Sequence, residues 1–289
     1  MSLEDALAAA TGSAVIESTR VGGGCINEGR RVEVEDGRRL FVKTRQDAAP
    51  GEYAGEAHGL RWLAEPGAVN VPEVVAVSDE DAGTDPRFLA LEWIDEGGLS
   101  AEGAEQLGRG LAALHAAGAE SFGAPLPLRI STIELPNDPL GDWPEFYAER
   151  RLRPLARRAR DAGSLSAAGA DAVERVCERL GELAGPPEPP ARLHGDLWGG
   201  NVLADARGQG WLIDPLAYAG HREVDLAMLR LFGAPSPRIL AAYAEAHPLA
   251  DGHEQRVDLW QLFPLLVHAV LFGGGYGAQA ERAARRYTG

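Results

Sequence analysis

Three polar residues in the second half of the sequence have the types and the spacing needed for phosphoryl transfer. Asp196 and Asn201 are five residues apart in the run His-Gly-Asp-Leu-Trp-Gly-Gly-Asn, residues 194–201, and Asp214 follows the apolar run 210–213. Phosphoryl transfer from ATP requires a carboxylate that accepts the proton of the attacking hydroxyl, and oxygen ligands that hold Mg²⁺ against the phosphates. We therefore predict Asp196 as the catalytic base and Asn201 and Asp214 as magnesium ligands.

Each half of this pattern also has an ordinary structural explanation. The run 194–201 would by itself be a capped turn, and Asp214 would be a residue that ends a strand. Short motifs taken singly produce many false matches. Here the two halves occur in the expected order and are joined by a hairpin-length turn, residues 204–210, which favours the catalytic interpretation.

The first part of the chain predicts the elements that would present ATP to this loop. A strand over residues 14–19 leads into three consecutive glycines, which let backbone N–H groups come close to phosphates. The predicted phosphate loop consists of Gly22, Gly23, Gly24, Cys25, Ile26 and Asn27. A flexible turn is the alternative for the glycines. For Cys25, a redox-active thiol and a small residue that fits a tight loop both stay open.

A lysine and a glutamate follow the glycines in the order that a nucleotide site needs. Residues 31–43 alternate on both sides of Asp36-Gly37, which predicts a hairpin that ends at Lys43. There the lysine charge can reach the α and β phosphates. A helix predicted over residues 52–64 places Glu56 where it can pair with Lys43 and aim it. Solvated surface is the alternative for either residue alone.

Two more strands and a hinge complete the predicted N-terminal lobe. The strands cover residues 71–77 and 88–94, so that the lobe contains five strands and one helix. An acidic, glycine-containing stretch follows at residues 92–98, and we interpret it as a hinge. Its backbone, at Glu92 and Ile94, is predicted to bind the adenine edge.

The remainder of the chain is predicted to be mainly helical, which makes the fold class α+β. Helices are expected over residues 101–117, 143–161, 167–184, 238–245, 256–272 and 278–287, with an irregular proline-rich connection over residues 123–137. We divide the chain into a nucleotide-binding lobe, residues 1–94, and a catalytic and substrate-binding lobe, residues 95–289. Asp225 opens a further helix, as an N-cap or as a support of the catalytic loop.

Composition restricts the possible partners and the compartment. The 289 residues carry a formal net charge of −15, which argues against nucleic acid and anionic membranes as partners. Two cysteines exclude a disulfide framework and suit a reducing compartment. The N-terminus lacks the features of a signal peptide, and the apolar stretch 262–272 is too short to span a bilayer. We expect a cytoplasmic protein without membrane contact.

The chain resembles the fructosamine kinase (ketosamine-3-kinase) family, in the aminoglycoside-phosphotransferase branch of the kinase superfamily, over nearly its whole length. The resemblance rests on residues 22–28, 41–43, 59–63, 194–201, 222–228 and 271–276. The resemblance implies a bilobal protein kinase-like fold, with ATP and Mg²⁺ as cofactors. It also implies phosphorylation of the sugar 3-hydroxyl of ketoamines (fructosamines or ribulosamines), after which the unstable adduct releases its amine in a deglycation pathway.

The resemblance identifies fewer of the residues that would contact the acceptor substrate. Trp198 stands where protein kinases have a lysine, and it either walls a substrate pocket or belongs to the core. Our candidate substrate contacts are Trp198, His221, which stands where the family has an aspartate, and His268. Protein kinases have Phe-Gly after the aspartate that binds the metal, whereas here Pro215 and Leu216 follow Asp214. The resemblance therefore does not imply that phosphorylation switches this loop.

Several alternatives stay open at the level of sequence. The substrate is a small-molecule ketoamine or a glycated lysine of a protein, and its sugar is not defined. Another hydroxylated amine, of the aminoglycoside or choline type, is the second hypothesis, and a nucleotide-binding module without catalysis is the third. Against the third, Lys43, Asp196, Asn201 and Asp214 are all present. The sequence does not distinguish a monomer from a dimer.

Overall fold

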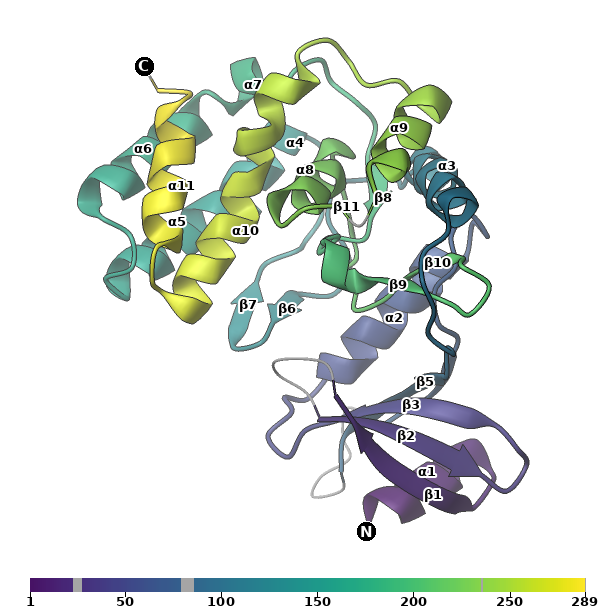
Figure 1. Ribbon diagram of the computed structural model, residues 1–289. Helices are drawn as coiled ribbons and strands as arrows, with labels where there is room; N and C mark the ends of the chain where they lie inside the picture. The colour runs from purple at the N-terminus through teal and green to yellow at the C-terminus, as the bar shows by residue number, and fades with distance from the viewer. Residues whose placement is uncertain (23–27, 79–85, 235, 289) are drawn as a thin grey trace.

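A five-stranded sheet and a larger helical part make up the molecule (Figure 1). The computed structural model describes residues 1–22, 28–78, 86–234 and 236–288. The long helix α2 lies between the sheet and the helical part, at the bottom and top of the view respectively (Figure 1). In the part of the chain that is described, no helix has both the length and the apolarity needed to cross a bilayer.

The sheet is antiparallel throughout, with the strand order β1-β2-β3-β5-β4. Its strands are β1 (Val15–Val21), β2 (Glu28–Val34), β3 (Arg39–Thr44), β4 (Val74–Val77) and β5 (Phe88–Glu92). The β2–β3 hairpin turns at the predicted place, where Gly37 has a φ of 88° that favours glycine. The predicted five-stranded sheet is therefore confirmed.

Two helices cover opposite faces of this sheet. Along β5, Phe88 and Ala90 pack in the cluster that contains α1 (Leu3–Thr11), whereas Leu89 and Leu91 pack in the cluster that contains α2 (Glu52–Ala64). This division follows from the alternation of side chains along a strand. The sequence analysis assigned no element to α1, although Ser2 and Asp5 form a capping box at its start.

The helical part contains two apolar cores. Its helices are α3 (Ala101–Ala117), α4 (Trp143–Tyr147), η1 (Ala148–Leu152), α5 (Arg153–Asp161), α6 (Ala167–Glu178), α7 (Leu180–Leu183), α8 (Glu223–Leu231), α9 (Pro237–Ala246), η3 (His253–Arg256), α10 (Val257–Phe272) and α11 (Tyr276–Arg285). One core contains side chains from the helices α4 through α7 and from α10 and α11. The other contains side chains from α3, α8 and α9. Short strands between these helices carry the catalytic motifs: β8 (Ala191–Leu193), β9 (Val202–Ala204), β10 (Gly210–Leu212) and β11 (Tyr218–Gly220).

Two predictions about the helical part are wrong in detail. Residues 143–161 form α4, the π-helical turn η1 and α5 rather than one helix. Pro154 has no N–H for the carbonyl of Arg150, and the Arg151 guanidinium donates to that carbonyl at 3.0 Å instead. The connection 123–137 was expected to be irregular, but it contains the hairpin of β6 (Leu128–Ile130) and β7 (Ile133–Leu135).

Candidate active site

The catalytic loop brings Asp196 and Asn201 into direct contact. The loop begins after β8, and the one-turn 3₁₀-helix η2 (Gly199–Asn201) returns the chain toward Asp196. The side-chain amide nitrogen of Asn201 donates to the Asp196 carbonyl at 2.8 Å and to the Asp196 carboxylate at 3.0 Å. Because this nitrogen is used on Asp196, the other amide atom of Asn201, its oxygen, is the one available for a cation.

A two-stranded hairpin delivers Asp214 to the same place. Strands β9 and β10 pair antiparallel directly after η2, and the Ile213 N–H donates to the Asn201 carbonyl at 3.1 Å. Asp214 has a φ of 56°, a left-handed conformation that is uncommon for a residue with a side chain. Backbone strain of this kind persists where the surroundings fix it, and it is common at functional sites.

Lys43 joins the sheet to this hairpin. Its side chain is only 6% exposed, and its ammonium donates to Glu56 on α2 at 2.7 Å and to the Asp214 carboxylate. Burial alone would lower the pKa of Lys43, but the charges of Glu56 and Asp214 outweigh it, so that the pKa lies above its ordinary value. Lys43 is therefore a fixed cation beside Asp214.

Burial makes the Asp196 carboxylate more basic than an exposed aspartate. Desolvation raises its pKa to about 6, against the smaller lowering effect of the Asn201 hydrogen bond. A carboxylate with such a pKa is mostly ionised at neutral pH and is still basic enough to accept a proton from a substrate hydroxyl.

A fully buried histidine holds the two carboxylate-bearing segments in register. The His194 ring bonds through Nε2 to the Ile213 carbonyl at 2.8 Å, and the Asp196 N–H donates to Nδ1 at 3.3 Å. Burial lowers the pKa of His194, which keeps the ring neutral with its proton on Nε2. The sequence analysis gave His194 no role, although it precedes Asp196 in the motif.

Asp225 supports the loop from behind. Its carboxylate accepts the backbone N–H groups of His194 at 2.7 Å and of Gly195 at 2.9 Å. Helix α8 begins at Glu223, so Asp225 lies inside the first turn and is not the N-cap. Of the two roles considered for Asp225, the N-cap is wrong and the support of the loop is confirmed.

Two glycines of the motif lie in close contact with their surroundings. Gly195 has a φ of 83°, and a Cβ there would lie 2.0 Å from the Leu216 carbonyl oxygen. At Gly200 a Cβ would lie 2.2 Å from the ring of Trp198. The Leu216 oxygen belongs to the backbone and φ is positive, so Gly195 needs glycine for the loop to keep this shape, whereas at Gly200 the exposed Trp198 ring would have to move.

Trp198 belongs to a group of exposed and half-buried rings beside the catalytic loop. Its side chain is 39% exposed and lies edge-on to Phe232, with 6.0 Å between ring centroids. The group continues through His268, whose ring lies 5.3 Å from Phe232, 5.5 Å from Phe272 and 4.9 Å from Tyr276. We call Trp198, Phe232, His268, Phe272 and Tyr276 the aromatic surface. Positive-φ glycines at positions 273 and 274 turn the chain between the last two rings.

His221 lies away from this surface. It is 3% exposed, and its ring stacks on Trp260 with 5.1 Å between centroids, in the core between β11 and α10. The expectation of a substrate contact on an open rim does not fit this burial, and we withdraw His221 as a candidate. No local pattern around residue 221 indicates that its side chain would pack against Trp260.

The remaining predicted residues are placed only in part. Gly22 follows β1, and Gly23 to Asn27 lie outside the described residues. In the hinge, the backbone N–H of Glu92 already donates to the Glu73 carbonyl at 3.0 Å, which removes that group from an adenine contact. Ile94 lies two residues after β5.

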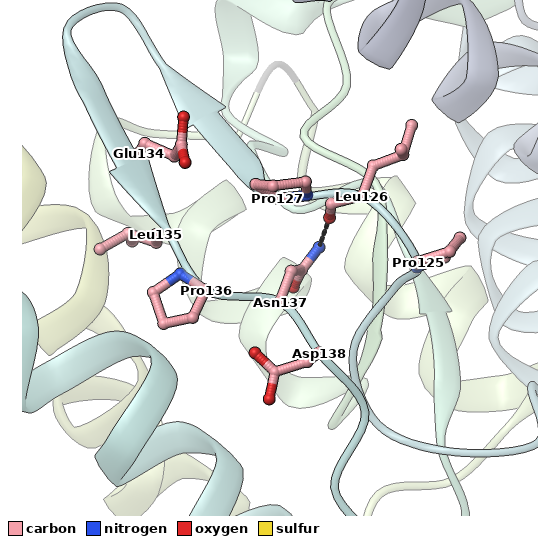
Figure 2. A pocket seen from close by; sticks show the side chains of 8 residues that line it. All are labelled: Pro125, Leu126, Pro127, Glu134, Leu135, Pro136, Asn137 and Asp138. Carbon is pink, nitrogen blue, oxygen red and sulfur yellow. Dashed lines mark hydrogen bonds between the residues drawn. The ribbon is translucent and has the colours of Figure 1, made fainter.

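A surface groove elsewhere in the helical part contains none of these residues. It has a volume of about 410 Å³ and lies beside the β6–β7 hairpin, where Asn137 donates to the Leu126 carbonyl at 3.0 Å (Figure 2). Its lining consists of Pro125, Leu126, Pro127, Glu134, Leu135, Pro136, Asn137 and Asp138. The candidate active site is therefore defined by side-chain geometry and not by this groove.

The fold is that of the kinase-like phosphotransferases. The same fold occurs in a thermostable mutant of an aminoglycoside phosphotransferase, solved as a ternary complex with ADP and hygromycin B. That likeness has a TM-score of 0.65 at 17% identity and covers 100% of both chains, so it concerns the fold alone.

The particular family follows from closer matches. The model of the fructosamine kinase family matches residues 1–288, and this chain belongs to that family of ATP-dependent kinases. The crystal structure of a Thermobifida fusca protein described as a fructosamine-3-kinase has a TM-score of 0.90 at 46% identity, over 99% of both chains. The chloroplastic protein-ribulosamine 3-kinase of Arabidopsis thaliana is 35% identical over 265 residues, 90% of this chain and 79% of the relative. The resemblance, the fold class and the kinase activity predicted from the sequence are thus confirmed.

Proposed function

We propose that this protein transfers the γ-phosphoryl group of ATP to the 3-hydroxyl of the sugar in a ketoamine, a fructosamine or a ribulosamine. The resulting 3-phosphate is unstable and releases the free amine. The observation that carries the proposal is the convergence of Lys43, Asp196, Asn201 and Asp214, from both parts of the molecule, in a member of the fructosamine kinase family.

Asp196 acts as the base in the proposed mechanism. Its carboxylate accepts the proton of the sugar hydroxyl as the oxygen attacks phosphorus, and the hydrogen bond from Asn201 keeps the carboxylate oriented. Lys43 contacts the α and β phosphates and is aimed by Glu56. Catalysis in this scheme comes mainly from positioning and from charges set in place before the reaction.

The donor set suits magnesium, which prefers oxygen ligands, few carboxylates, and waters or phosphates in its other positions. The Asn201 amide oxygen and the Asp214 carboxylate would supply one neutral and one charged ligand, and the two residues flank the β9–β10 hairpin. Mg²⁺ bound there would neutralise charge that develops on the phosphates. Lys43 holds Asp214 in place from the opposite part of the molecule.

We propose that the aromatic surface binds the acceptor. A ketoamine carries a protonated secondary amine next to its sugar, and cations are attracted to the faces of aromatic rings. Trp198 is two residues from the base, and His268 adds a polar group at the centre of the other rings. The surface is open, so it would admit a free amine or a lysine side chain of a protein.

Further parts of the sequence interpretation belong to this proposal. Residues 22–27 would cover the phosphates, and the boundary between the nucleotide-binding and catalytic lobes would lie at residues 92–98, with Ile94 near the adenine. In that stretch the Gly97 N–H donates to the Ala204 carbonyl at 2.8 Å, so the hinge contacts the β9–β10 hairpin. We also propose a cytoplasmic location, which rests on the small number of cysteines.

The test is Mg²⁺-dependent ATP consumption with ribulosyl-lysine, fructosyl-lysine, an aminoglycoside, choline or no acceptor. We expect turnover of a ketoamine, with a 3-phosphate that decays to free lysine. Turnover of only the aminoglycoside or choline would keep the mechanism and overturn the substrate. ATP binding without turnover of any acceptor would contradict the proposed function.

A further inference from the structure

Three buried polar side chains from three helices form a line behind the catalytic loop. His115 on α3 lies between Asp225 on α8 and Tyr243 on α9. Its Nε2 is 3.3 Å from the Asp225 carboxylate, and its Nδ1 is 2.8 Å from the Tyr243 hydroxyl. All three residues are buried, so water does not compete for these bonds.

The chemistry of Asp225 fixes the direction of its hydrogen bond with His115. The Asp225 carboxylate is an acceptor, and the backbone N–H groups of His194 and Gly195 already donate to it. The Nε2 of His115 therefore carries a proton and donates to Asp225. On the other side of the ring, Nδ1 shares a hydrogen bond with the Tyr243 hydroxyl, which can donate or accept.

We infer that His115 is a positioning residue for the phosphoryl transfer, with Tyr243 as its support; the inference rests on the proposed function. His115 gives the buried Asp225 carboxylate a side-chain donor and fixes its rotation. Asp225 in turn fixes the two peptide N–H groups that precede Asp196. Without His115 the buried Asp225 carboxylate would lose one hydrogen-bond donor and could rotate. The lost bond would lower the stability of the protein, and the rotation would loosen the catalytic loop.

This line of bonds acts on the geometry of both acids of the site. The backbone of His194 is held by Asp225, while the ring of His194 bonds to the segments that carry Asp196 and Asp214. A displacement of a reacting group by about 1 Å can lower a rate on the order of 10²-fold. A rotation of the Asp225 carboxylate would therefore change kcat by moving Asp196 and Asp214, without changing how ATP binds.

The test compares His115→Leu, which removes the donor, with His115→Gln, whose amide nitrogen can donate to Asp225. Leu111→Ala, a core truncation on the same helix, is the control for stability alone. With the ketoamine as acceptor, we expect His115→Leu to lower kcat about 10-fold with little change in KM for ATP. His115→Gln should recover most of kcat, and Tyr243→Phe should show a smaller loss.

A second readout does not require activity. Amide hydrogen exchange at His194 and Gly195 should be faster in His115→Leu than in Leu111→Ala, compared at equal distance below their melting temperatures. Equal exchange in the two variants, or equal kcat when both are folded, would show that His115 only packs and would overturn the inference. If the wild-type protein turned over no acceptor, the proposed function would fail, and the exchange data would still decide whether His115 orders the loop.

Discussion

The catalytic loop and the aromatic surface lie next to each other but are held in different ways. Asp196 is tied to Asn201, to the ring of His194 and, through the peptide N–H groups before it, to Asp225. The aromatic surface is held mainly by ring contacts of 4.9 to 6.0 Å, and Phe272 in it is 60% exposed. Directional bonds fix one region, and non-directional packing fixes the other.

This difference suggests that the catalytic loop positions the reacting groups and that the aromatic surface binds the acceptor. A base and a metal ligand must be held within a fraction of an ångström, which buried hydrogen bonds achieve. A surface that accepts a cationic amine on variable carriers gains from rings that tolerate small displacements. Changes in the catalytic loop should therefore act on kcat, whereas changes in the aromatic surface should act on KM for the acceptor.

The largest expected effect is that of Asp196→Asn. The amide retains the shape of the side chain but cannot accept the hydroxyl proton, and we expect kcat to fall on the order of 10²-fold or more. Steady-state kinetics with saturating ATP and ketoamine would measure this loss. Full activity of the variant would show that another group is the base.

The same substitution should have the opposite effect on stability. The pKa of Asp196 is about 6 in the folded protein and lies above the value of 3.8 for an exposed aspartate. The folded state thus binds its proton more tightly, and ionisation lowers stability as the pH rises through this window. In the absence of nucleotide, Asp196→Asn should melt at a higher temperature than the wild type at pH 7, and the difference should disappear as the pH falls toward about 4.

The second prediction concerns Lys43→Met, which removes the cation shared by Glu56 and Asp214. Two carboxylates would then face each other without a counter-charge, and the phosphates would lose a contact. We expect kcat/KM for ATP to fall about 100-fold, with KM for the ketoamine little changed. Arg160→Met, which removes an exposed cation on α5, is the matched control and should leave both constants as in the wild type.

The candidate residues of the catalytic loop were predicted from the sequence, although the hydrogen bonds of His194 that hold them were not. Asp196, Asn201, Asp214 and Lys43 lie in short motifs whose spacing reflects a fixed local geometry, and the β2–β3 hairpin followed from one Asp-Gly pair. Such features depend on neighbours in sequence, so motif spacing and turn chemistry are sufficient to predict them.

Features that depend on packing between distant segments were not found. His221 was predicted as a substrate contact because it stands where the resembled family has an aspartate, but stacking on Trp260, in the later helix α10, buries it. The rings around His268 come from a loop after α8, from α10 and from α11, and no local pattern joins them. The π-helical turn before Pro154 contains Arg151, whose guanidinium donates to the Pro136 carbonyl at 3.0 Å and to the Asn137 side chain at 2.5 Å, and the sequence does not indicate these bonds.

The third prediction is the pH dependence of the reaction. Because the base must be ionised, kcat/KM for the ketoamine should fall below the pKa of about 6 and be roughly tenfold lower one unit below it than on the plateau. The acidic side of this pH profile tests the burial of Asp196 and not the aromatic surface. A plateau that extends unchanged to about pH 4.5 would contradict the assignment of Asp196 as the titrating base.

The smallest effect, and the sharpest test of the comparison, is expected for Trp198→Ala. Trp198 lies between the two regions: its backbone N–H donates to the Asp196 carbonyl at 3.0 Å, while its ring lies on Phe232. The substitution keeps the backbone bond and removes only the ring, so KM for the ketoamine should rise about 10-fold, with kcat and KM for ATP within about twofold of the wild type. Phe272→Ala, at the far end of the surface, is the matched control and should raise the same KM less. If Trp198→Ala lowered kcat instead, the ring would be part of what holds Asp196, and the division between a bonded region and a packed region would not hold.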